Sequence, residues 1–331
     1  MIRNKTYDYI VRLGVKFKKL AHFEYWPTLL IYIPLVPKLV SLFVRSGSLY
    51  AFRDTNPGFR FKSIIRESKI DILNSIPAKW LPKTLFLNQA DRAEWKGQIL
   101  EFQNFPIICK PETGERGRGV SLLRDEIALD AYLSKFEGNL IVQEYIHYPI
   151  ELGIFYIRIP GEKKGFISSI VRKEPMEVIG DGISTLRVLM ENNFRYLIQL
   201  LAENKDRELA LDMVLPKGKR VVLDPIANHA RGTRFVDCYE YLHPEMEEVI
   251  GSISDDIKGF YYGRFDLKIE SLDSFKEGVG IKIIELNGIW SEPTHIYDSR
   301  NSILDNYKTI ADHFNYAYLI AKLNRERNIE A

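Results

Sequence analysis

Runs of apolar residues recur from about residue 64 onward and have the length and composition of β-strands. They are rich in β-branched and aromatic residues and lie at 105–111, 140–146, 153–160, 166–174, 220–227, 263–270 and 281–287. Between them, apolar residues at helical spacing predict helices over 67–76, 125–136, 184–205, 243–260 and 303–323. Short strands and helices are mixed along the chain without an internal repeat, and the predicted fold class is α+β.

The first 60 residues differ from the rest of the chain. Residues 1–22 carry six basic side chains and one acidic side chain, Asp8, a net charge of 6 − 1 = +5. The apolar segment 26–44 follows, but Pro27, Pro34 and Pro37 interrupt it. A membrane-spanning helix needs about 20 mostly apolar residues, so these breaks argue against a span. Two interpretations of residues 1–45 remain open: contact with an anionic membrane surface, or packing on the protein's own core or on a second subunit of a homodimer.

Composition narrows the class of protein. The 331 residues are 46% hydrophobic and 27% charged, enough to bury a sizeable core, and the net charge of 46 − 44 = +2 does not favour nucleic acid as a partner. The two cysteines, Cys109 and Cys238, provide neither a disulfide framework nor a zinc site. No secretory cleavage site follows an apolar stretch at the start. These features predict a cytoplasmic protein, with the inner face of the membrane as an additional location.

Oxygen-bearing side chains gather on two of the predicted strands. Glu285 and Asn287 are two residues apart and therefore face the same side of their strand. If the intervening loop turns the chain back, Asp266 lies across from Glu285, and Arg264 lies across from Asn287. Carboxylate and amide oxygens are the hard ligands that Mg²⁺ prefers. An ordinary ion pair on a solvated sheet face is the alternative interpretation.

A glycine-rich loop, KPETGERGRGVSLL at 110–123, lies between two predicted strands. Gly114, Gly117 and Gly119 free the backbone to approach a phosphate, and Lys110 adds a charge at the end of the preceding strand. The loop has neither the Walker nor the Rossmann glycine pattern. A phosphate-binding loop and a plain surface hairpin therefore both remain open.

The order of these motifs resembles the ATP-grasp superfamily from about Lys69 to Asn287. The resemblance implies two α/β lobes with antiparallel sheets enclosing the nucleotide: a nucleotide lobe at about 61–150 and a metal and substrate lobe at about 151–331. Residues 1–60 stand in place of a longer amino-terminal domain. The resemblance further implies that Lys69 and Lys110 contact phosphates and that Glu151 binds ribose. The hinge that meets adenine would consist of Gln143, Glu144, Tyr145 and Ile146. Arg264 and Asp266 resemble the GRxD element of D-alanine–D-alanine ligases, and Glu285 with Asn287 matches their E-x-N metal motif.

Two further segments indicate a subgroup. Residues 178–193 and 215–245 resemble parts of cyanophycin synthetase and the glutathione-type ligases. The sequence departs from that subgroup at 229–233 and from the D-alanine ligases after Asn287.

The resemblance implies an ATP-dependent ligase that joins a small-molecule carboxylate to an amine or thiol through an acyl-phosphate, with ATP and Mg²⁺. Arg264 would stabilise the developing oxyanion, Arg231 and Arg234 would hold the substrate carboxylate, and loop 113–120 would close over the phosphates. Two alternatives remain: a phosphotransferase without ligation, and a non-catalytic nucleotide-binding module associated with a membrane.

Overall fold

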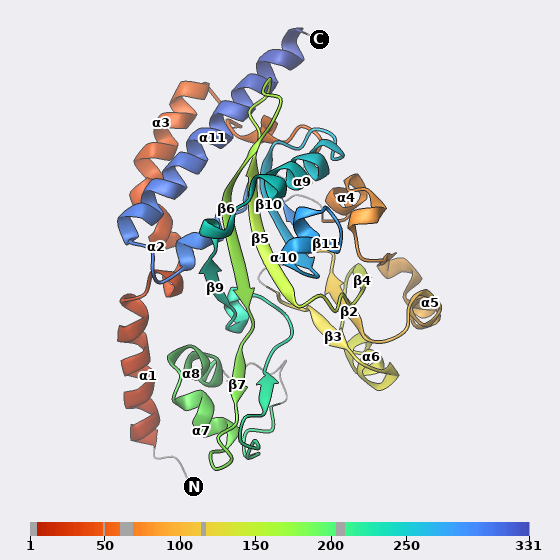
Figure 1. Cartoon of the computed structure of the whole chain (residues 1–331), viewed down its shortest axis with the longest axis vertical. Coiled ribbons are helices and arrows are strands. Elements are labelled where there is room, and N and C mark those ends of the chain that lie inside the picture. The colour runs from red at the N-terminus through yellow and green to blue at the C-terminus, as the bar shows by residue number, and fades with distance from the viewer. Residues whose placement is uncertain (1–4, 49, 60–68, 114–116, 203–208, 331) are drawn as a thin grey trace.

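The computed structural model describes residues 5–48, 50–59, 69–113, 117–202 and 209–330, and its framework is a pair of separate antiparallel sheets (Figure 1). A four-stranded sheet has the order β1-β4-β2-β3, and a five-stranded sheet has the order β11-β10-β5-β6-β9. A small ribbon, β7 (Glu177–Ile179) with β8 (Arg220–Val222), extends from the larger sheet. The predicted arrangement of two α/β lobes with antiparallel sheets is confirmed.

The smaller lobe is built on the four-stranded sheet. Its strands are β1 (Thr84–Leu87), β2 (Ile107–Pro111), β3 (Ser121–Leu123) and β4 (Leu140–Glu144), and its helices are α5 (Trp95–Phe102) and α6 (Glu126–Leu133). Trp95 and Ile99 of α5 and Leu129 of α6 pack with Ile107 and Val142 in one buried cluster. The side chain of Asp125 caps α6 by accepting a hydrogen bond from the amide of Ala128, at 2.8 Å.

The larger sheet is covered on both faces. Its strands are β5 (Ile150–Ile157), β6 (Phe166–Glu174), β9 (Arg234–Asp237), β10 (Tyr262–Ile269) and β11 (Ile281–Asn287). Because strand side chains alternate, Ile154 and Tyr156 of β5 pack with α9 (Pro244–Asp255), whereas Phe155 and Ile157 pack with α11 (Ile303–Glu330). Two shorter helices, α4 (Lys69–Ser75) and α10 (Leu272–Lys276), join the α9 side. Strands buried on both faces explain why their sequences are almost continuously apolar.

Two predicted elements differ from the structure. The helix predicted over 184–205 is two helices, α7 (Leu186–Glu191) and α8 (Phe194–Leu201), because the side chain of Asn193 caps a new helix start. The strand predicted over 220–227 ends at Val222, where Asp224 turns the chain by accepting a hydrogen bond from the amide of Ile226, at 3.0 Å.

The amino-terminal region lies along one long edge of the molecule, with α1 beside α8 and α3 beside α11 (Figure 1). It comprises α1 (Lys5–Leu20), η1 (Phe23–Tyr25), α2 (Thr28–Tyr32), η2 (Ile33–Leu35) and α3 (Val36–Ser46). Phe23, Ile31 and Leu35 are buried against Ile296 and Ile310, so this region shares a core with the body of the protein. The remaining short 3-10 helices are η3 (Arg53–Thr55), η4 (Ala78–Trp80), η5 (Gln89–Glu94), η6 (His229–Arg231), η7 (Tyr239–Tyr241) and η8 (Thr294–Tyr297).

The residues Thr28–Ser46 are long and apolar enough to cross a membrane, judged by length and composition. The inward side of this stretch, however, is buried in protein: Ile31, Leu35 and Leu42 pack inside the fold. The packing interpretation of residues 1–45 is therefore correct for the inward side, and the outward side is considered below.

Candidate functional site

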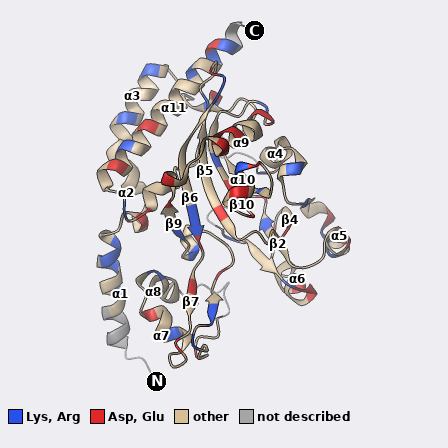
Figure 2. Cartoon of the chain, in the orientation of Figure 1, with Lys and Arg blue, Asp and Glu red and all other residues tan. Residues whose placement is uncertain are grey.

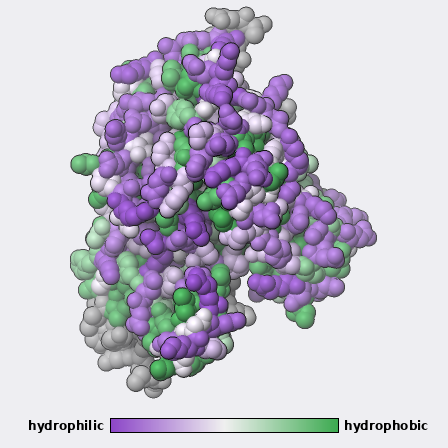
Figure 3. All heavy atoms as spheres, viewed as in Figure 1, coloured by the Kyte–Doolittle hydropathy of each residue, from purple (hydrophilic) through white to green (hydrophobic). Residues whose placement is uncertain are grey.

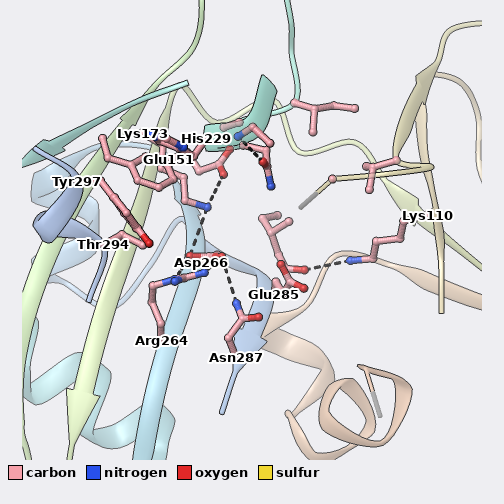
Figure 4. Close-up of a pocket in the computed structure, with 18 of the residues that line it drawn as sticks. Lys110, Glu151, Lys173, His229, Arg264, Asp266, Glu285, Asn287, Thr294 and Tyr297 are labelled. Atoms are coloured by element: carbon pink, nitrogen blue, oxygen red, sulfur yellow. Dashed lines mark hydrogen bonds and ion pairs between the residues drawn. The ribbon is translucent and has the colours of Figure 1, made fainter. Parts of the chain in front are cut away.

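A cavity of about 780 Å³ is lined by both lobes and by the amino-terminal region (Figure 4). The predicted residues that line it are Lys69, Lys110, Gly117, Gln143, Glu144, Tyr145, Ile146, Glu151, Arg264, Asp266, Glu285 and Asn287. They come from widely separated parts of the sequence, and folding brings them around one space.

Strands β10 and β11 pair in the register that the sequence predicted. Asp266 lies opposite Glu285, and Arg264 lies opposite Asn287. The pairing becomes irregular directly after Asp266, between Asp266 and Leu267. Two carboxylates, one amide and one guanidinium therefore share the wall of the cavity.

Asp266 is buried within a set of positive charges (Figure 4). It accepts hydrogen bonds from Nε and Nη2 of Arg264, at 2.9 and 3.1 Å, and its Oδ1 lies 3.3 Å from Nζ of Lys173. Burial alone would raise the pKa of Asp266, but Arg264 and Lys173 hold that pKa below its usual range. The amide of Asn287 also donates to Asp266, at 3.3 Å. The carboxylate is therefore ionised and fixed in position.

Two lysines reach β11 from outside the larger sheet. Nζ of Lys69, on α4, lies 3.1 Å from a carboxylate oxygen of Glu285. Nζ of Lys110, on β2 of the smaller lobe, donates to the carbonyl of Ile284 at 3.2 Å. Burial lowers the pKa of Lys110 to about 8. Burial also opposes ionisation of Glu285, but Lys69 and Lys110 keep the pKa of Glu285 below its usual range.

The predicted hinge lies at the end of β4. Lys268 Nζ donates to the carbonyl of Ile146 at 2.9 Å and lies over the ring of Tyr145. The side chain of Gln143 donates to Thr84 at 2.9 Å, which holds β4 beside β1. Glu151 lies 3.1 Å from Lys173, the lysine that also contacts Asp266. The predicted adenine and ribose residues thus line the cavity, while their roles stay predictions.

The glycine-rich loop approaches the cavity at Gly117, which lines it. Gly117 and Gly119 have φ values of +71° and +70°, a conformation that side-chain-bearing residues rarely adopt. Residues 114–116, including Gly114, lie outside the described residues. The prediction that this loop closes over phosphates therefore stays a prediction.

Arg231 and Arg234 are not among the residues that line the cavity, and the prediction that they hold a substrate carboxylate stays a prediction. Arg231 is buried, donates to Asp224 at 2.9 Å, and donates to the carbonyls of Gly117 and Val120. Arg234 is exposed, 3.7 Å from Glu174. The guanidinium of Arg231 supports the glycine-rich loop from behind.

The sequence did not predict two residues beside Asp266. Lys173 shares its carboxylate, as described above. The hydroxyl oxygen of Thr294 is buried without a hydrogen-bond partner in the described part of the chain. A β-carbon added at Gly153 would lie 3.4 Å from both this hydroxyl and Asp266. An unpartnered polar atom next to a charged cluster is the position where a ligand oxygen would be bound.

The amino-terminal region supplies another part of the wall, also not predicted. Residues 24–28 line the cavity. Glu24 is buried and pairs with Arg195 at 2.7 Å and with His229 at 3.3 Å. Tyr32 on α2 and Tyr297 on η8 both donate hydrogen bonds to Glu292, another lining residue. Charged and aromatic groups thus define the end of the cavity away from Lys110 (Figure 4).

Comparisons with known proteins agree with this geometry. The tubulin-tyrosine ligase family matches residues 58–153. The glutathione biosynthesis bifunctional protein GshAB of Clostridium perfringens is 24% identical over 249 residues, covering 68% of this chain and 29% of that protein. Cyanophycin synthetase of Crocosphaera subtropica is 25% identical over 191 residues, covering 50% of this chain and 21% of that protein. The chain thus spans less than a third of the length of these curated relatives.

Solved structures give the same kind of match. The VanG D-Ala:D-Ser ligase of Enterococcus faecalis is 13% identical with a TM-score of 0.43, covering 76% of this chain and 61% of that chain. The sequence matches confirm the predicted resemblance: the chain is similar to the ATP-grasp ligases, and its two lobes with antiparallel sheets are those that the resemblance implied.

Proposed function

We propose that the protein is an ATP-dependent ligase that joins a small-molecule carboxylate to an amine, using Mg²⁺ and ATP bound in the cavity. The observation that carries the proposal is that two groups of charged and polar side chains meet in the cavity. Asp266, Glu285 and Asn287 lie on the paired strands β10 and β11, and Lys69 and Lys110 reach them from outside that sheet. Carboxylates, an amide and lysines around one cavity provide ligands for a metal and for the phosphates that it neutralises.

The residues present fit Mg²⁺ by their chemistry. Asp266 and Glu285 offer carboxylate oxygens, and Asn287 offers an amide oxygen once its side chain turns over. No three His, Cys, Asp or Glu side chains group as a metal site in the described ranges, so phosphate oxygens would complete the coordination. The unpartnered hydroxyl of Thr294 beside Asp266 is consistent with a further ligand there. Bound Mg²⁺ would neutralise phosphate charge during transfer.

The protein's own groups would prepare the transfer. Lys69 and Lys110 would hold the terminal phosphates from the side opposite Asp266. Arg264 is locked by its two hydrogen bonds to Asp266 and by a third, at 3.0 Å, to the carbonyl of Glu292. A fixed guanidinium at this place would stabilise the oxyanion that forms when the amine attacks an acyl-phosphate. The aromatic and acidic end of the cavity would bind the acceptor.

The test is phosphate release by the purified protein from Mg-ATP across a panel of amino acids and other carboxylates, with mass spectrometry of the products. A product that combines both substrates, formed with one ADP and one phosphate, supports ligation. A stable phosphorylated product formed without an amine contradicts it and identifies a phosphotransferase.

Variants connect the activity to the cavity. Glu285→Gln and Asp266→Asn should remove turnover and weaken Mg²⁺-dependent nucleotide binding, measured by calorimetry, while the fold is retained. Asp256→Asn is the matched control, because Asp256 is also paired with a lysine, Lys79, but does not line the cavity. Unchanged Mg²⁺-dependent affinity in both cavity variants would overturn the metal assignment.

A further inference from the structure

The stretch from α2 to α3 has apolar residues on two opposite sides. The inward side is buried, as described above. The outward side carries a row of exposed apolar residues, here called the outer apolar face. These residues are spaced as i, i+4, i+7, i+11 and i+15, the positions that share one side of a helix. Its members are Leu29, Ile33, Val36, Val40 and Val44, each between 48% and 75% exposed. Exposed apolar side chains that lie together in this way are typical of a surface that binds a partner.

The outer apolar face continues along the same edge onto α1. Leu13, Phe17 and Leu20 are exposed at helical spacing, and the exposed Lys16 lies between them. In the space-filling view, hydrophobic residues along this edge are interspersed with hydrophilic ones (Figure 3). Helix α1 therefore adds exposed apolar side chains to the edge that carries the outer apolar face.

The charged residues along this edge are almost all basic. Between residues 11 and 46 there are six basic residues, Arg12, Lys16, Lys18, Lys19, Lys38 and Arg45, against Glu24 as the one acidic residue. Lysine and arginine appear on both α1 and α3 (Figure 2). Glu24 is buried and paired with Arg195, so it does not offset this charge at the surface. Arg12, Lys18 and Lys19 contact the body of the protein at Leu201, Phe194 and Tyr25. The cations that flank the exposed apolar side chains are therefore Lys16, Lys38 and Arg45, and this combination matches the interface of an anionic bilayer.

We propose that α1 to α3 dock this protein on the surface of an anionic lipid membrane, with the outer apolar face in the interface. The geometry favours lying on the surface over spanning, because Ile31, Leu35 and Leu42 on the other side are buried in the protein. A helix held on one side by its own domain offers only its opposite side to lipid. Docking in this way also brings residues 24–28, and hence one wall of the cavity, next to the membrane.

The test is flotation of the full chain with vesicles of phosphatidylcholine alone or mixed with phosphatidylglycerol. The protein should float with the mixed vesicles. Leu29→Gln, Val40→Gln and Val44→Gln combined should lower the partition on the order of a hundredfold. Lys16→Gln and Arg45→Gln should each lower it about fivefold. Ile127→Gln is the matched control, because Ile127 is 82% exposed on α6, away from this edge, and should change nothing.

Four outcomes would overturn the proposal. One is absence of flotation with either vesicle, and another is equal flotation of the triple variant and the unaltered protein. A dimer that the triple variant converts to a monomer, with no lipid binding, would show that the face joins two copies of the chain. Circular dichroism melting verifies that each variant is folded. Resistance of membrane-bound protein to alkaline carbonate would identify a spanning helix and contradict surface docking.

Discussion

Replacing Lys110 with methionine should make the protein more stable and at the same time impair its nucleotide site. Lys110 is buried, and its pKa of about 8, against an ordinary value of 10.5, shows that the fold disfavours its charged form. At about 1.4 kcal/mol per pKa unit, the charged lysine costs about 3 kcal/mol at neutral pH. Lys110→Met removes that cost but leaves the carbonyl of Ile284 without this donor, a loss of about 1 kcal/mol. The expected net gain is about 2 kcal/mol.

The gain should depend on pH with a defined sign. Below pH 8 the folded and unfolded chains both carry the proton on Lys110, so the unaltered protein bears the whole cost. Between pH 8 and 10.5 the folded chain has lost this proton and the unfolded chain keeps it, so the stability of the unaltered protein rises with pH. The advantage of Lys110→Met should therefore be largest at pH 7 and shrink toward pH 10.5.

Urea unfolding of both proteins at pH 7 and at higher pH measures this difference, and calorimetry measures nucleotide affinity. Affinity for Mg-ATP should fall at least about tenfold, because the proposed contact between Lys110 and a phosphate would be lost. Lys164→Met is the matched control: the Lys164 side chain is 80% exposed and pairs with Glu248, so its stability change should stay within about 0.5 kcal/mol. A Lys110→Met protein that is less stable at pH 7, by an amount that pH does not alter, would refute this reasoning.

Three other substitutions test separate parts of the site. Arg264→Lys keeps the charge but loses the double hydrogen bond to Asp266, so turnover should fall on the order of a hundredfold with thermal stability little changed, and steady-state kinetics measures it. Tyr32→Phe removes a hydroxyl from Glu292, so KM for the acceptor should rise while the Kd for Mg-ATP stays constant; a change in that Kd alone would contradict this assignment. Arg231→Met withdraws the guanidinium from buried Asp224 and should cost about 3 kcal/mol, measured by urea unfolding, whereas Arg234→Met, at an exposed pair, should cost less than about 1 kcal/mol.

The pairing of β10 with β11 was predictable because the sequence information that specifies it is local. Side-chain alternation in 281–287 and the short return from β10 fix which residues share a side, and the observed register follows. Lys173 was not predictable in this way. It reaches Asp266 because β6 and β10 both pair with β5, and nothing in the sequence near either residue specifies that neighbourhood.

The contacts of the amino-terminal region with the cavity were not predictable for the same reason. Charge and proline breaks indicated that residues 1–45 were unusual, but the contacts of Glu24 with Arg195 and His229 span about half the chain. The predicted roles for Arg231 and Arg234, which do not line the cavity, came from residue type alone. An arginine satisfied by a buried aspartate seven residues earlier looks, in sequence, the same as one that faces a substrate. The break at Asn193 did have a local signal, a helix-capping asparagine, which the continuing apolar spacing obscured.

The division of the cavity wall has a consequence for how such a protein can diversify. Residues 24–28 form part of one end, while Lys69, Lys110, Asp266 and Glu285 come from stretches beginning at α4. Substitutions at Tyr25 or Trp26 can therefore reshape one end of the cavity and leave the register of β10 and β11 untouched. This freedom belongs to single side chains and not to the whole segment, because Phe23, Ile31 and Leu35 on either side are buried in the core. Two adjacent aromatic positions are thus where the shape of the cavity can change by point substitution alone.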